Sequence, residues 1–72
     1  MTPVLWLPRD GGGWRASGDG YRVLIFPVKT GWNATVTFTA DGATETSHFQ
    51  GADDAMTMIT ALLVGLGLAA AA

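Results

Sequence analysis

The stretch ADDAMTMITALLVGL, residues 52–66, decides the fold, because it is predicted to form the one amphipathic helix of the chain. Successive residues of a helix are about 100° apart, and this spacing gathers its apolar side chains on one continuous arc. The arc comprises Ala52, Ala55, Met56, Met58, Ile59, Leu62, Leu63 and Leu66. Asp53 and Asp54 lie in the first turn, where carboxylates favour the positive end of the helix dipole. Gly65 and Gly67 mark the predicted end of the helix.

Four segments that precede the helix have the composition and alternation of β-strands. They are residues 14–17, 21–28, 32–39 and 43–49. The Asp-Gly pairs at residues 19–20 and 41–42 favour hairpin turns between them. The sequence therefore predicts an α+β fold, in which an antiparallel sheet of three to four strands is covered on one face by the C-terminal helix.

A single helix covers only one face of a sheet, so the helix alone does not explain what covers the second face. We expect the helix on the face of Trp32, Val36 and Phe38. The opposite face then combines Leu24 and Phe26 with a polar row from the next strand, which comprises Asn33, Thr35 and Thr37. Either the segment Val4–Leu7 or a partner covers this second face.

The 72 residues are expected to form one small domain. Residues 1–13, which contain the triple glycine at 11–13, are expected to form an extended N-terminal segment, and residues 67–72 a frayed tail. The chain has no cysteine, and its first residues lack the basic and apolar regions of a secretion signal. We therefore expect a cytoplasmic protein that does not insert into a membrane.

No pattern of residues indicates an enzyme. His48 is the only histidine, and its neighbour Ser47 points to the other side of a strand. Asp53 and Asp54 diverge around the helix, and the triple glycine lacks the Lys-Ser/Thr ending of a phosphate-binding loop. We expect no catalytic residue, no metal site and no cofactor.

Surplus apolar surface in so short a chain favours a non-enzymatic protein-binding module. The expected interface consists of Val4, Leu5, Trp6, Leu7, Leu24, Phe26, Val64 and Leu68. The expected partner is another protein or a second copy of the chain in a homodimer. An accessory or inhibitor protein of a phage or mobile element fits this description.

An alternative function is the binding of single-stranded nucleic acid on the sheet. Cations stand beside aromatic residues on consecutive strands, an arrangement that can stack bases and hold phosphates. The residues concerned are Arg15, Arg22, Lys29 and Trp14. The net charge of −2 and the presence of only four basic residues make nucleic acid the less favoured partner on sequence grounds.

Overall fold

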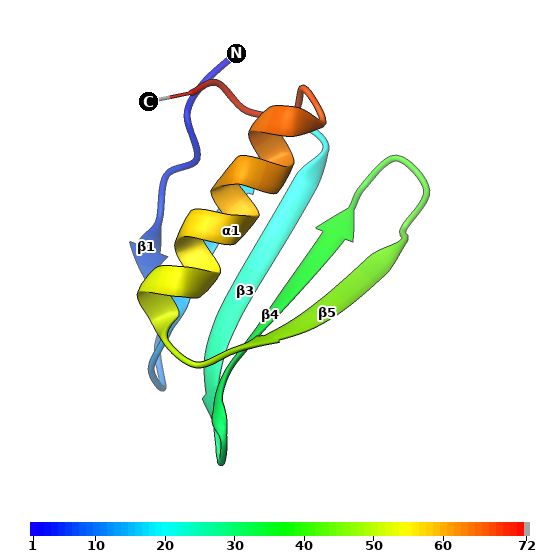
Figure 1. Ribbon diagram of the computed structural model, residues 1–72. Coiled ribbons are helices and arrows are strands. Elements are labelled where there is room, and N and C mark those ends of the chain that lie inside the picture. The colour runs from blue at the N-terminus through cyan, green and yellow to red at the C-terminus, as the bar shows by residue number, and fades with distance from the viewer. Residues whose placement is uncertain (72) are drawn as a thin grey trace.

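The computed structural model describes residues 1–71, which form one antiparallel sheet followed by one helix (Figure 1). The elements are β1 (Leu7–Pro8), β2 (Trp14–Gly18), β3 (Tyr21–Val28), β4 (Gly31–Phe38), β5 (Thr44–Phe49) and α1 (Ala52–Gly65). The strands lie side by side in chain order, so each is joined to the next by a hairpin. This confirms the α+β class and the single C-terminal helix.

The sheet has five strands where three to four were expected. The additional strand is β1, whose Leu7 and Pro8 pair with Arg15 and Trp14 of β2. A two-residue strand leaves no alternation in the sequence, and its pairing depends on the glycine-rich turn that reverses the chain. The other strands and the helix match their expected ranges to within one residue at each end.

Helix α1 covers one face of the sheet, and the core lies between the two layers (Figure 1). The buried residues are Ala16, Tyr21, Val23, Ile25, Ala34 and Val36 of the sheet, Ala55, Ile59 and Leu63 of the helix, and Ala69 beyond it. Trp32 and Phe38 pack against this cluster, so the helix lies on the predicted face.

The apolar arc of the helix is wider than the sheet can cover. Met58, Leu62 and Leu66 were expected inside it, but 59%, 39% and 54% of their surfaces are exposed. A sheet contacts only the part of a helix that faces it, and here that part is centred on Ala55, Ile59 and Leu63.

The N-terminal segment runs beside the helix and leaves the second sheet face uncovered (Figure 1). Val4 and Trp6 pack against the core cluster. The indole nitrogen Nε1 of Trp6 donates a hydrogen bond of 3.2 Å to Oγ1 of Thr60 on α1. The segment Val4–Leu7, which was one of the two expected covers of the second sheet face, therefore does not cover it.

The chain beyond the helix is ordered against the core as far as it is described, in contrast to the frayed tail that we expected for residues 67–72. Gly67 adopts a positive φ of 75°, and its N–H donates to the carbonyl of Val64 at 3.0 Å. The N–H of Leu68 donates to the carbonyl of Leu63 at 2.9 Å, which completes a Schellman motif. This reversal buries Ala69 and lets the N–H of Ala70 donate to the carbonyl of Thr2. Residue 72 lies outside the described residues.

Candidate functional site

The face of the sheet opposite α1 carries the candidate site, and we call it the open face. Its members follow from the strand register, because residues directly paired across two strands point to the same side. They are Leu7, Arg15, Ser17, Arg22, Leu24, Phe26, Val28, Asn33, Thr35, Thr37, Thr44, Thr46 and His48. Most are polar or basic, which distinguishes this face from the apolar one under the helix.

Polar pairs organise the half of the open face that belongs to β4 and β5. The hydroxyl oxygens of Thr35 and Thr46 lie 3.2 Å apart, and Nδ1 of His48 lies 2.9 Å from Oδ1 of Asn33. The second ring nitrogen of His48 lies 3.2 Å from the carbonyl oxygen of Thr30. Both nitrogens of the only histidine are thus engaged in structural contacts, which tie the β5 edge to the rest of the sheet.

Arg15 and Arg22 dominate the other half of the open face. Arg15 pairs with Leu24 and Ser17 with Arg22, so the two arginines are diagonal neighbours on β2 and β3. Both are exposed. Between them and β4 lies a half-open hollow of about 370 Å³, whose side-chain walls are Arg15, Ser17, Arg22, Leu24, Thr35 and Thr37. This hollow offers two guanidinium groups, three hydroxyl groups and one exposed leucine.

A third arginine reaches the open face from the turn between β1 and β2. The guanidinium carbon of Arg9 lies 5.8 Å from the centroid of the Phe26 ring, within the range of a cation–π contact. Arg9 is held there by its own turn, since its Nη1 donates to the carbonyl of Gly12 at 2.9 Å. Arg9 was not among the site residues expected from the sequence. The only signal was its position directly before Asp10 and the triple glycine.

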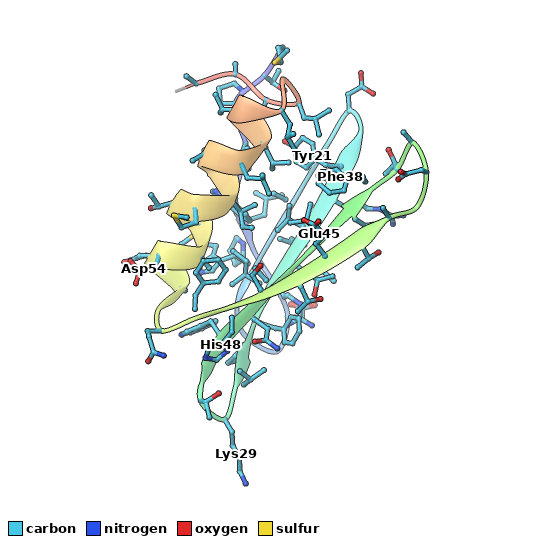
Figure 2. The ribbon with its side chains drawn as sticks, turned by 45° about the vertical axis from the view of Figure 1, so that its right-hand side comes forward. Tyr21, Lys29, Phe38, Glu45, His48 and Asp54 are labelled. Atoms are coloured by element: carbon cyan, nitrogen blue, oxygen red, sulfur yellow. The ribbon has the colours of Figure 1, made fainter. Side chains whose placement is uncertain are left out.

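The acidic side chains lie elsewhere. Within residues 1–71, no aspartate or glutamate belongs to the open face. Asp10, Asp19 and Asp41 are in the hairpin turns, and Glu45 pairs with buried Val36 and so points to the helix side. Asp53 and Asp54 occupy the first turn of α1, and Figure 2 shows Asp54 projecting away from the sheet. The chain is acidic overall, yet its open face carries only positive charge.

The four residues named for nucleic-acid binding fall into three places. Arg15 and Arg22 come together on the open face. Lys29 extends from the tip of the β3–β4 turn, at one end of the molecule (Figure 2). Trp14 pairs with buried Ile25 and packs against the core on the helix side. The structure therefore separates the aromatic group from the cations that were expected to work with it.

The residues named for a protein interface are also divided. Val4, Trp6, Val64 and Leu68 pack against the core cluster, which uses most of their apolar surface. Leu7, Leu24 and Phe26 belong to the open face, where Leu24 is 44% exposed and Phe26 is half-buried beside Arg9. Leu5 is exposed. The residues that sequence reasoning missed are Met58, Leu62 and Leu66, which form an exposed ridge along α1.

Metal sites, membrane-spanning helices and known relatives give no further indication of function. No group of three or more His, Cys, Asp or Glu side chains is placed to hold a metal ion in residues 1–71. Over the same range, helix length and hydropathy fall short of what crossing a membrane requires. Comparison of the chain with protein-family models, with curated proteins and with solved structures finds no match. The geometry of the open face is therefore the main indication of function.

Proposed function

We propose that this chain is a non-enzymatic domain that binds nucleic acid on the open face of its sheet. The observation that carries the proposal is the separation of charge, in a chain of net charge −2: two arginines belong to the open face and a third reaches it, whereas no carboxylate belongs to this face within residues 1–71. A polyanion is repelled by the acidic helix side and attracted by this one face, so the charge pattern also fixes the orientation of binding. We also propose a cytoplasmic location, which is compatible with such a function.

The open face has the chemical groups that phosphates need. Guanidinium groups bind phosphate oxygens through paired N–H donors, and Arg15 and Arg22 present two of them on adjacent strands. The hydroxyls of Ser17, Thr35 and Thr37 line the hollow between these arginines and can donate to phosphate or sugar oxygens. The backbone of these residues is already fixed by strand pairing, so little backbone order has to be gained when the ligand binds.

The first test measures the binding of a fluorescently labelled DNA by anisotropy over a series of salt concentrations. With three arginines neutralising phosphates, the logarithm of the association constant should fall against the logarithm of salt with a slope of about −2 to −3. Arg15→Ala and Arg22→Ala should each weaken binding, and the slope should become less steep by about 0.9 for each substitution that removes a phosphate contact. Failure of the unaltered chain to bind at low salt contradicts the proposal.

A matched pair of variants separates the open face from net charge. Thr37→Asp introduces a carboxylate directly opposite Arg22, whereas Thr57→Asp makes the same charge change on an exposed position of α1. The first variant should lose binding and the second should retain it, because only the first alters the potential at the site. Equal losses in both variants would mean that the open face is not where the ligand binds.

A protein-binding function, of the accessory or inhibitor kind, is the second candidate, and the exposed ridge of Met58, Leu62 and Leu66 favours it. Contiguous apolar side chains of this kind mark interfaces, and a second copy of the chain is the simplest occupant. Sedimentation equilibrium tests it: the unaltered chain should dimerise with rising concentration and Met58→Ser should not. A monomer at every attainable concentration would exclude the homodimer.

A further inference from the structure

The open face lacks a platform on which the bases of a single strand could stack. Phe26 is its only Phe, Tyr or Trp within residues 1–71, and it is half-buried with Arg9 beside its ring. The exposed ring of His48 is held by contacts to Asn33 and Thr30. The other aromatic side chains lie in the core or pack against it, and they are Trp6, Trp14, Tyr21, Trp32, Phe38 and Phe49. Single-strand binding normally depends on exposed aromatic rings, so this face is poorly equipped for it.

The same face is suited to the edges of paired bases. Two rows of side chains cross it, each with one residue from every strand between β2 and β5. The first row is Arg15, Leu24, Thr35 and Thr46, and the second is Ser17, Arg22, Thr37 and Thr44. Arginine donates to guanine O6 and N7 in the major groove, and apolar side chains contact the thymine methyl group. Each row thus offers one arginine, and the first adds the exposed Leu24.

The β2–β3 hairpin, which carries both arginines, also has suitable dimensions. Antiparallel strands lie about 4.8 Å apart, so β2 and β3 together are narrower than the major groove of B-form DNA, which is about 12 Å wide. Because β3 is paired with β4 along its whole length, the hairpin would enter with its face toward the bases and not as a free ribbon. Strand β4 lies directly beside this hairpin and would bring Thr35 and Thr37 toward the phosphates of the groove wall. The major groove of A-form RNA is too deep and narrow for such an approach.

We infer that the ligand of the open face is double-stranded DNA, entered through the major groove by the β2–β3 hairpin with Arg15 and Arg22 at the base edges. This inference rests on the proposed nucleic-acid function and narrows it to one class of ligand. It also replaces stacking on aromatic residues, which the sequence alone had suggested, by contacts from arginine and hydroxyl groups.

The test compares one mixed-sequence DNA duplex with each of its separate strands and with the RNA duplex of the same sequence, by anisotropy at low salt. The DNA duplex should bind at least about tenfold more tightly than the other three, since only it presents an accessible major groove. Methyl green, which occupies the major groove, should displace the protein, and netropsin, which occupies the minor groove, should not.

The possible results distinguish the proposed nucleic-acid function from the narrower inference of duplex DNA. If no nucleic acid binds, the proposed function itself is wrong. If a single strand or the RNA duplex binds as tightly as the DNA duplex, and Arg22→Ala weakens that binding, the function stands and the inference of duplex DNA is overturned. Displacement by netropsin overturns the groove assignment.

Conservative variants test whether the arginines contact bases as well as phosphates. Arg15→Lys and Arg22→Lys keep the charge but lose the paired donors, and both positions are exposed, so the fold should tolerate them. In a set of DNA duplexes of unrelated sequence, each should weaken binding to the duplex that the unaltered chain binds most tightly by about tenfold, and leave binding to the weakest-bound duplex nearly unchanged. Equal weakening on every duplex would assign the arginines to phosphates alone and overturn this part of the inference.

Discussion

At the scale of single residues, Gly13 decides where the first hairpin lies. Its φ is +97°, and a Cβ atom at this position would collide with the backbone carbonyl of Ile25. Only glycine therefore allows the chain to pass this close to β3 and begin β2. The same turn receives a hydrogen bond from the Arg9 guanidinium, so the glycine run also orients an arginine of the open face.

Gly13→Ala should destabilise the protein by about 2–3 kcal/mol, because it adds a backbone collision to the strain of a positive φ. Gly11→Ala is the matched control, since Gly11 has a φ of +85° but a Cβ atom added there would meet nothing within 4 Å. It should cost only about 1 kcal/mol. Urea denaturation followed by tryptophan fluorescence measures both, and equal costs would contradict the role of the close contact.

At the scale of elements, the N-terminal segment is part of the core layer on the helix side. Trp6 packs against the core and bonds to Thr60, whereas its neighbour Leu7 is exposed on the open face. Of these two adjacent residues, Trp6 thus contributes to the core and Leu7 to the open face. Substitution of the two residues should therefore affect different properties.

Trp6→Ser should lower the free energy of unfolding by about 1.5–3 kcal/mol, through lost burial and the lost hydrogen bond. Leu7→Ser should change it by less than about 0.5 kcal/mol, as is usual at exposed positions. Thermal unfolding followed by circular dichroism compares the two. A stable Trp6→Ser variant would show that the segment does not depend on this side chain for its docking.

The end of α1 supplies a second prediction at this scale. Gly67→Ala should destabilise the protein by about 1 kcal/mol, because alanine disfavours the positive φ of the Schellman motif. Gly65→Ala, two residues earlier within the helix and with open space around it, should stabilise by about 0.5–1 kcal/mol. Chemical denaturation measures the change in the free energy of unfolding of both variants. A Gly65→Ala variant that is less stable than the unaltered chain would contradict the position of the helix end.

At the scale of the whole molecule, the N-terminal segment and the chain that follows the helix lie side by side (Figure 1). Pro3 and Ala70 form a parallel bridge, and the buried Ala69 belongs to the core cluster. This closure holds the N-terminal segment against the helix side of the molecule, while the open face and the ridge of Met58, Leu62 and Leu66 remain exposed.

Truncation after Leu68 should therefore loosen the N-terminal segment as well as remove the tail. Hydrogen exchange should become faster at residues 3–6, while the amides of β3 and β4 stay protected by the central sheet. Extension by a polar residue after residue 72, which leaves Ala69 and Ala70 in place, is the control. Unchanged exchange at residues 3–6 in the truncated chain would mean that the two ends are independent.

Local pattern alone determined most of the secondary structure. Alternation over residues 32–39, the apolar run of 21–28, the Asp-Gly turns and the helical arc of 52–66 are all short-range signals, and each element lies where its signal places it. The face on which the helix packs followed from the same alternation. The two arginines of the site could also be named from the sequence, since each stands beside an aromatic residue on consecutive strands.

Tertiary structure decided what depends on contacts between distant residues. The pairing of β1, the docking of Trp6 on Thr60 and the burial of Ala69 join segments far apart in the chain, and no local periodicity records them. Trp14 and Arg15 are adjacent in the sequence, but they lie on opposite faces of the sheet. The sequence contained the charges, but only the folded sheet separated them, because alternate residues of a strand point to opposite faces.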